Sequence, residues 1–119
     1  NFLKNNQIIE IYLIKGLILL EEGKIEEGEK IILEAIKIFQ QVENPLAESK
    51  CWTRLGIACF LKGNLEEAES KLKTSVEKSR ACFFQYGEAT ALFELGKLYH
   101  LQKKTDNAKQ CLESAQKDI

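Results

Sequence analysis

The sequence predicts an all-α fold, a solenoid of three antiparallel helix pairs. One sparse pattern returns every forty residues, around Gly16, Gly56 and Gly96. Apolar residues recur at three- and four-residue spacing, and no segment shows the alternation of a half-buried strand. Glycines and one Asn-Pro pair separate these segments by short turns. A single helix pair cannot bury its apolar face alone, so the three pairs are expected to stack.

Six helices are expected, in three pairs. Their ranges are Asn5–Glu22 with Glu26–Gln41, Pro45–Lys62 with Leu65–Ala81, and Glu88–Gln102 with Asp106–Lys117. Apolar residues cover most of the circumference of the first helix, so we expect it to be buried on more than one side. These residues are Ile8, Ile9, Ile11, Tyr12, Leu13, Leu17, Ile18, Leu19 and Leu20.

Asn44-Pro45 is the clearest boundary in the chain. An Asn side chain can cap a helix by accepting a hydrogen bond from a free backbone N–H, and Pro is tolerated at the first helical position. Lys62-Gly63-Asn64 predicts a left-handed helix stop at Gly63 and a cap at Asn64, with Glu67 as the acidic member of a capping box.

Two further local features carry expectations. Thr105 or Asp106 is expected to cap the last helix. The aromatic residues Phe83, Phe84 and Tyr86 are too apolar for a solvated loop, so we expect them to cover the seam between the second and third pairs.

The repeat places glycine inside three helices in one register, although glycine in a helix costs about 1 kcal/mol relative to alanine. Close approach of a neighbouring helix to the backbone would explain this choice. The first helices read Tyr12-x-x-Lys15-Gly16-x-x-Leu19, Trp52-x-x-Leu55-Gly56-x-x-Cys59 and Leu92-x-x-Leu95-Gly96-x-x-Tyr99. The second helices carry small residues at 28, 68 and 108, and large apolar residues at 32, 72 and 112.

These motifs resemble the tetratricopeptide repeat, in which an aromatic residue is followed by Leu-Gly, Tyr, Ala and a large apolar residue. The resemblance covers essentially the whole chain, and the middle repeat matches best. It implies a right-handed α–α superhelix, one domain over residues 1–119 with repeats at about 5–43, 45–84 and 85–119. Lys15 replaces a core leucine and Gly28 the usual alanine, so we expect the first pair to be the least stable.

The spacing of forty residues exceeds the roughly 34 of the common tetratricopeptide repeat. Such lengthened repeats resemble those of bacterial signalling regulators, of large regulatory ATPases and cyclases, and of some scaffold proteins. The chain contains no methionine, and we expect it to be part of a longer protein.

The composition excludes several classes of partner. Seventeen Lys and Arg residues face eighteen Asp and Glu residues, which is not the charge balance of a nucleic-acid binder or a polybasic membrane ligand. The most apolar run, Ile8–Leu20, is too short and too charged to cross a bilayer. We therefore expect no nucleic-acid or membrane partner and a cytoplasmic location.

The sequence carries no catalytic constellation, and we expect no enzyme activity, metal or cofactor. Cys51, Cys59, Cys82 and Cys111 form no C-x-x-C pair, so they are expected to be reduced thiols that pack as small hydrophobic residues. His100 is the only histidine, and no nucleophile and base can be assembled around it.

The resemblance also implies a concave groove, lined by the first helix of each pair, that holds a peptide or a partner helix. The positions of this chain that match are Leu13, Leu17, Leu20, Thr53, Ile57, Phe60, Phe93, Lys97 and His100. Leu17 and Ile57 stand where the family's carboxylate clamp needs asparagine, so binding of C-terminal chaperone tails is disfavoured.

Two functional hypotheses follow from this row of residues. The first is a non-catalytic protein-interaction module of a larger cytosolic regulator or scaffold. The second is a regulatory tail of a multidomain ATPase, cyclase or transcription regulator, which packs on its own other domains or senses a small ligand. The apolar row can equally serve assembly, by packing on further repeats or by self-association through the groove or the open ends.

Overall fold

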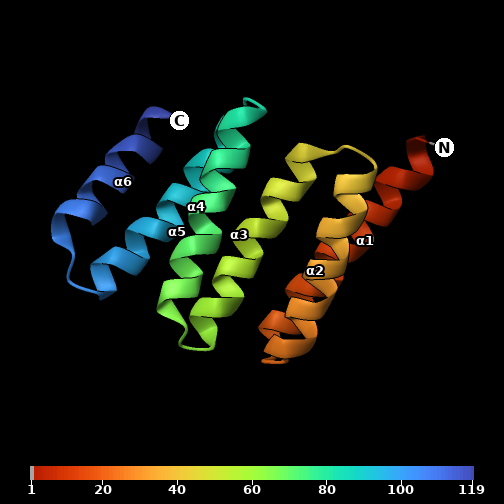
Figure 1. Cartoon of the computed structure of the whole chain (residues 1–119), viewed down its shortest axis with the longest axis horizontal. Helices are drawn as coiled ribbons and strands as arrows, with labels where there is room; N and C mark the ends of the chain where they lie inside the picture. The colour runs from red at the N-terminus through yellow and green to blue at the C-terminus, as the bar shows by residue number, and fades with distance from the viewer. Residues whose placement is uncertain (1) are drawn as a thin grey trace.

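The computed structural model confirms an all-α chain of six helices, with no strand in the residues that it describes, 2–119. Side chains are described from Gln7 onward except that of Ile9, which therefore lies outside the test of the first helix. The helices are α1 (Phe2–Glu21), α2 (Ile25–Gln41), α3 (Pro45–Leu61), α4 (Leu65–Ala81), α5 (Gln85–Leu101) and α6 (Thr105–Lys117) (Figure 1).

The helices form three consecutive antiparallel pairs that stack along the longest axis of the molecule, as the solenoid prediction required (Figure 1). The second helices α2 and α4 each pack on their own first helix and on the first helix of the next pair, and α6 packs on α5. In addition, α3 contacts both α1 and α5, whereas the described parts of α2, α4 and α6 make no such contacts with one another. The array therefore curves, with α1, α3 and α5 on its inner side.

The forty-residue period follows from the lengths of the elements. Helices α2 to α5 each contain 17 residues. Three residues separate each of them from the next helix, so one helix and one turn occupy twenty residues. The lengthened repeat is thus built from two helices of equal length. The predicted bounds of α4 are confirmed, and the largest errors are the starts of α1 and α5, which each lie three residues before the expected Asn5 and Glu88.

Each turn places a left-handed residue at the same point of the twenty-residue period. The φ angles are +81° at Gly23, +54° at Glu43, +85° at Gly63, +57° at Phe83 and +62° at Lys103. The predicted stop at Gly63 is confirmed, and three other turns reach the same conformation without glycine, which costs about 1–2 kcal/mol each. Paired backbone hydrogen bonds offset this cost, as at Gly63 and the residue after it, whose N–H groups donate to Phe60 and Cys59 carbonyls at 2.9 Å.

The turn geometry also decides which residue caps each helix. The residue directly after the left-handed one is the N-cap in every turn, whatever its side chain. The Asn44 prediction is confirmed, because its Oδ1 accepts a hydrogen bond from the Ala47 N–H at 3.1 Å. Asn64 occupies the N-cap position but its side chain makes no capping bond, so the predicted capping box is wrong. Lys104, and not Thr105 or Asp106, precedes α6.

The register glycines lie where one helix touches the backbone of another. A Cβ atom at Gly56 would lie 2.7 Å from Leu72 Cγ, and one at Gly96 would lie 2.8 Å from Leu112 Cδ2. At Gly16 the nearest atom is Ile32 Cγ1, at 3.0 Å. The explanation of the repeat by close helix approach is confirmed, since an extra methyl group would require each partner to move.

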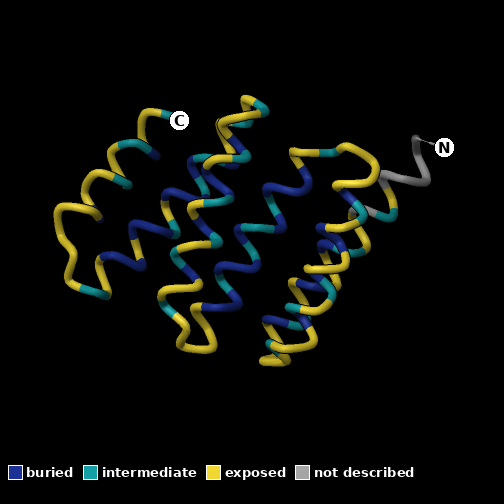
Figure 2. The backbone as a smooth tube through the Cα atoms, viewed as in Figure 1, coloured by how far each residue is buried: buried dark blue, intermediate teal, exposed yellow. Residues whose placement is uncertain are grey.

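Two burial predictions are wrong. The first helix is not covered on more than one side, because Ile11 and Ile18 are each about half exposed and Lys15 is exposed, not in the core. Figure 2 shows how buried and exposed stretches alternate along the helices. The aromatic cluster covers the seam only in part. Phe83 and Tyr86 project into solvent, and Phe84 alone packs its ring against Gly87 at the start of α5. The left-handed turn at Phe83 directs that side chain outward. Because α5 begins at Gln85, Tyr86 lies on the helix and not in the loop where it was expected.

Candidate functional site

A groove runs between α3 and α5 on the inner side of the array. It consists of two adjoining cavities of about 320 Å³ and about 360 Å³ that share Ile57. The first is lined by Gly56, Ile57, Phe60, Leu61, Ala68, Leu72, Glu94, Lys97, Leu98 and Leu101. The second is lined by Lys50, Thr53, Arg54, Ile57, Phe84, Tyr86, Gly87 and Thr90. We call the two together the α3–α5 groove.

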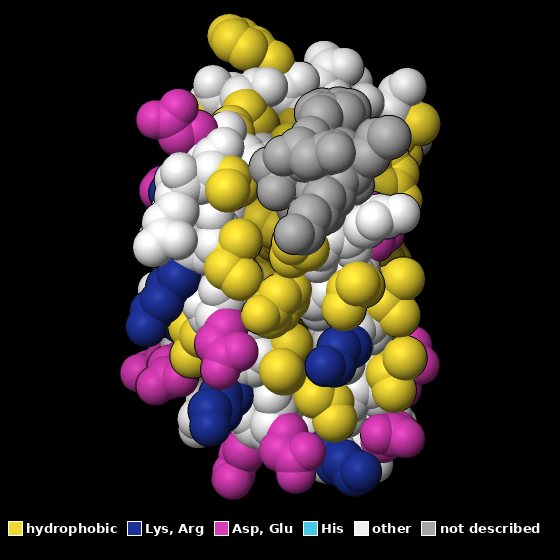
Figure 3. Space-filling view, turned by 90° about the vertical axis from the view of Figure 1, so that its right-hand side faces the viewer, with side chains coloured by type: hydrophobic (Ala, Val, Ile, Leu, Met, Phe, Trp, Pro, Cys, Tyr) yellow, Lys and Arg dark blue, Asp and Glu magenta, His cyan; other side chains and the backbone are white. Residues whose placement is uncertain are grey.

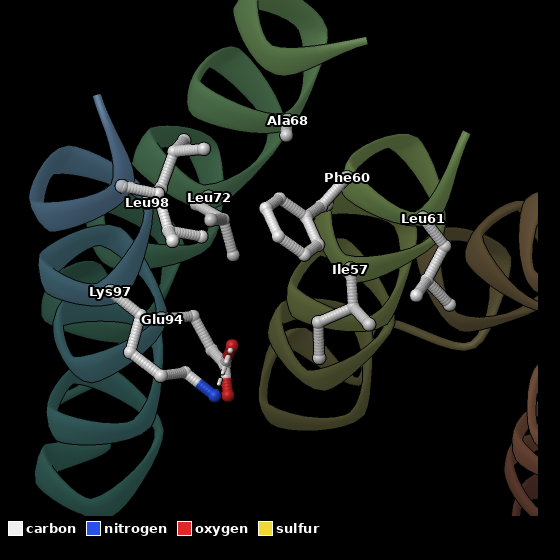
Figure 4. Close-up of a pocket in the computed structure, with 10 residues that line it drawn as sticks. Ile57, Phe60, Leu61, Ala68, Leu72, Glu94, Lys97 and Leu98 are labelled. Atoms are coloured by element: carbon white, nitrogen blue, oxygen red, sulfur yellow. Dashed lines mark ion pairs between the residues drawn. The ribbon is translucent and has the colours of Figure 1, made fainter. Parts of the chain in front are cut away.

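The first cavity is the apolar end of the groove. Phe60 reaches from α3 toward Leu72 and Leu98, and Ile57 projects into the same space one turn earlier (Figure 4). Phe60 is 37% exposed, so its ring is available to a partner. At the rim of this cavity Lys97 Nζ lies 3.2 Å from Glu94 Oε2, so the two charges there neutralise each other (Figure 4).

The second cavity is cationic and aromatic. Lys50 and Arg54 reach it from α3, and Phe84 and Tyr86 lie beside the start of α5. Lys50 Nζ stands 5.7 Å from the centre of the Phe84 ring. The Arg54 Nη1 atom is buried and has no hydrogen-bond partner among the described residues. A buried guanidinium N–H without an acceptor is costly, so this end of the groove favours an incoming carboxylate or carbonyl oxygen.

The groove contains four of the nine residues that the sequence indicated, namely Thr53, Ile57, Phe60 and Lys97. Leu17, Phe93 and His100 are exposed on α1 and α5 but line neither cavity. Leu13 and Leu20 are buried in the core of the first pair and do not line a groove. Thr53 is mostly buried too, because its Oγ1 lies 2.6 Å from Ser75 Oγ on the adjacent helix.

Leu20 is buried, and its equivalent Phe60 exposed, because of the residue opposite each. Leu20 packs against Gly28, where a Cβ atom would lie only 2.9 Å from Leu20 Cδ2. In the second pair Ala68 occupies the corresponding position, and the larger Phe60 ring turns toward the groove. Because Gly28 has no side chain, Leu20 packs against it in the core and does not line the groove as expected.

Sequence reasoning missed several lining residues. Leu61 and Leu101 are exposed apolar residues at the same register position, and that recurrence at the ends of two helices was a usable signal. Lys50 and Arg54 had no such signal, because the sequence indicated a mainly apolar row that turns polar only toward its C-terminal end, at Lys97 and His100. Leu98 is a core residue that also borders the first cavity, which no surface pattern could reveal.

The buried thiols are unsuited to nucleophilic chemistry. Burial raises the pKa of Cys51 to about 12. Burial, together with the Glu29 and Glu67 carboxylates, also raises the pKa of Cys59. All four cysteines are free thiols. A cysteine with a raised pKa stays protonated near neutral pH, and a protonated thiol is a weak nucleophile. Cys51 and Cys59 therefore serve as packing residues.

The described residues contain no group of three or more side chains that could hold a metal ion. None of the described helices is long and apolar enough to cross a membrane.

Comparison with known proteins identifies the architecture. The tetratricopeptide repeat model matches residues 7–81 and again residues 51–117. The chain belongs to the tetratricopeptide repeat family. Tetratricopeptide repeats generally mediate protein–protein interaction and are typically non-catalytic. The crystal structure of the TPR domain of FLU from Arabidopsis matches with a TM-score of 0.82 over 92% of each chain, at 18% identity, which is a likeness of fold. No curated protein matched the chain.

Proposed function

We propose that this tetratricopeptide repeat chain holds a segment of a partner protein in the α3–α5 groove, as an interaction module of a regulator or scaffold. The observation that carries the proposal is the pairing of an open apolar cavity at Phe60 with a cationic end at Arg54 on one continuous surface. Family membership supports binding of a protein, and the groove is where this chain offers both shape and charge to one.

The groove constrains the length and chemistry of the partner segment. Lys50 and Leu61 are eleven residues apart on α3, so the groove extends over about 16 Å. An amphipathic helix of about three turns, or a shorter extended peptide, spans that length. Such a segment would place an apolar side chain against Phe60 and Leu101, and a carboxylate at its other end near Lys50 and Arg54.

The size of the apolar cavity supports a side chain as its occupant. A volume of about 320 Å³ lies at the lower limit of small-molecule sites, which range over about 300–1,000 Å³. One or two leucine- or phenylalanine-sized groups fill it. The exposed apolar atoms around it then become buried, which is the main source of affinity in helix-in-groove recognition.

Selection from a displayed peptide library, followed by measured dissociation constants, tests the proposal. We expect selected peptides to share an apolar anchor and an acidic residue. Ile57→Glu should weaken their binding at least about tenfold, or about 1.4 kcal/mol, because it places a carboxylate where both cavities meet. Arg54→Gln should weaken peptides with the acidic residue more than peptides in which that residue is replaced by glutamine.

Phe83→Glu is the matched control. Phe83 is 91% exposed, lies outside both cavities, and has glutamate at the equivalent turn position, Glu43. This variant should bind selected peptides as the unmodified chain does. Peptides whose affinity is unchanged by Ile57→Glu but reduced by Phe83→Glu would place the binding site elsewhere and overturn the proposal.

A further inference from the structure

The register of the repeat shows which residues join one helix pair to the next. On the first helix of a pair, three positions face the preceding pair and are at most 3% exposed in both α3 and α5. They are Cys51, Leu55 and Ala58 in α3, and Ala91, Leu95 and Leu98 in α5. Their partners across the interface are on α2 and α4.

The same three positions of α1 are exposed. Ile11 is 53% exposed, Ile18 is 46% exposed, and Lys15 between them is exposed as well. Figure 3 views the molecule from this end and shows hydrophobic side chains gathered down the face. The exposed face of α1 thus has the composition of a joining surface, and Ile14 extends it at 51% exposure.

The far end of the array shows the matching change. Position 32 of the first pair and position 72 of the second are each 2% exposed, but the equivalent Leu112 on α6 is 43% exposed. Ile36 and Val76 are buried, whereas the equivalent Gln116 on α6 is exposed. In the first two pairs the next pair covers these positions. The outer face of α6 is therefore the surface on which a following pair would pack.

The polar residues at the two ends are complementary to each other. At the α2–α3 interface, Lys62 Nζ lies 2.8 Å from Glu29 Oε1 and joins the end of α3 to α2, whereas the α4–α5 interface has Glu69 and Gln102 at these positions. The equivalent positions at the ends are Glu22 beside α1 and Lys109 on α6, with the two charges interchanged. Stacking the outer face of α6 on the face of α1 would restore the ion pair with its polarity reversed.

A second substitution pair shows the same match. The core positions Ile36 and Leu55 belong to one buried cluster, and Val76 and Leu95 to the next. At the ends these positions become Gln116 on α6 and Lys15 on α1. The Gln116 carboxamide oxygen can accept a hydrogen bond from the Lys15 ammonium, so two apolar residues are replaced by two that suit each other.

We infer that copies of this chain associate head to tail, with the outer face of α6 of one copy packed on the α1 face of the next. The occupant of each end is a second copy because apolar area, one ion pair and one polar pair match between the two ends of the same chain. The contact repeats the α2–α3 and α4–α5 geometry. Such a contact joins two different surfaces and does not close, so it produces linear assemblies whose length grows with concentration.

Sedimentation or light scattering at increasing protein concentration measures this association. The unmodified chain should give a mass that rises beyond two copies. Ile18→Glu blocks the α1 face. Lys109→Glu/Gln116→Lys blocks the α6 face, because it places like charges opposite Glu22 and Lys15. Each variant alone should remain a single copy. An equimolar mixture of the two should form complexes that stop at two copies, because one intact face of each kind remains.

A charge exchange and a groove variant complete the test. Lys109→Glu alone should weaken association several-fold, and Glu22→Lys added to it should restore association, since both side chains are exposed and neither supports the core. Ile57→Glu, in the α3–α5 groove, should associate as the unmodified chain does. Circular dichroism confirms that each variant is folded. A mass of one copy at every concentration, or a mixture of blocked variants that forms no dimer, overturns the inference.

Discussion

The second and third helix pairs share one architecture but differ in what covers them. Leu72 and Leu112 occupy the same register position and pack against the equivalent glycines, Gly56 and Gly96. Leu72 is 2% exposed because α5 covers it, whereas Leu112 is 43% exposed. Residue type and register are therefore the same, and the neighbouring pair alone decides whether the position belongs to the core. Stability in such an array resides in the interfaces between pairs as much as within them.

The largest expected difference comes from truncating these two leucines. Leu72→Ala should lower the free energy of unfolding by about 2–5 kcal/mol, as is usual for a fully buried leucine. Leu112→Ala should cost about 1 kcal/mol, because nearly half of its surface is already in water. Chemical denaturation of both variants measures the two values. Equal losses would show that the third pair is as well covered as the second.

Glu48 and its equivalent Glu88 give a second contrast. Glu48 links α3 to both α2 and α4, whereas Glu88 links α5 to α4 alone among the described residues. Glu48 Oε2 accepts hydrogen bonds from Trp52 Nε1 at 3.0 Å and Gln40 Nε2 at 3.2 Å, and Lys78 Nζ lies 3.1 Å away. In the part of the chain that the structure describes, Glu88 pairs only with Arg80, at 3.0 Å. We expect Glu48→Gln to cost about 2 kcal/mol and Glu88→Gln less than about 1 kcal/mol.

The same site predicts a pH dependence. Burial raises the pKa of Glu48, but the hydrogen bonds from Trp52, Lys78 and Gln40 together outweigh it and hold the pKa below its ordinary value of 4.5. The folded form thus prefers the carboxylate. Its stabilising contribution is complete above pH 4.5 and is lost as the pH falls through the lowered pKa. The stability difference between the native chain and Glu48→Gln should be largest near neutral pH and shrink in acid. A difference that grows in acid would contradict this account.

The register glycines sharpen the comparison at a smaller scale. A methyl group at Gly56 would meet Leu72, which is enclosed, whereas one at Gly96 would meet Leu112, which has room to move. Overpacking costs about 1–3 kcal/mol, and replacing a helical glycine by alanine recovers about 1 kcal/mol. Gly56→Ala should therefore lower stability by about 1–2 kcal/mol and Gly96→Ala should be close to neutral. Thermal melting of the two variants separates them.

The smallest expected effect concerns a polar contact found only in the second pair. Ser75 Oγ donates to the Ser49 carbonyl at 2.9 Å and lies 2.6 Å from Thr53 Oγ1. The equivalent positions in the other pairs are apolar, as in Leu13 with Ala35. Ser75→Ala should cost about 1 kcal/mol by leaving Thr53 without its partner, and Thr53→Val added to it should recover most of that loss. A double-mutant cycle with no coupling would exclude a stabilising role for the contact.

Much of the fold could be predicted because the same residue pattern occurs three times, around Gly16, Gly56 and Gly96. Gly56 alone is a weak signal, but three glycines in register predicted the close approach that the structure contains. The turns were less readable. Glu43, Phe83 and Lys103 adopt left-handed conformations that their residue types do not favour, because the packing of the flanking helices imposes the geometry.

The groove was harder to predict than the fold because burial depends on the residue opposite. Leu20 and Phe60 share a register position. Leu20 is buried because it packs against Gly28, whereas Phe60, opposite the larger Ala68, is partly exposed. Lys15 was read as a core position from its equivalents Leu55 and Leu95. Those leucines are buried by a preceding pair, which is the one contact that α1 does not receive from the described chain.

Native-state hydrogen exchange at a concentration where the chain is a single copy tests the central comparison most directly. Helix α3 packs on α1 and α2 and on α4 and α5, and helix α4 packs on α3 and α5. The amides of these two helices should therefore exchange only through global unfolding. The amides of α6, and those of α1 on its exposed face, should exchange earlier through opening of the end pairs. Protection of α6 equal to that of α3 would contradict the conclusion that neighbouring pairs, and not register alone, decide which positions form the core.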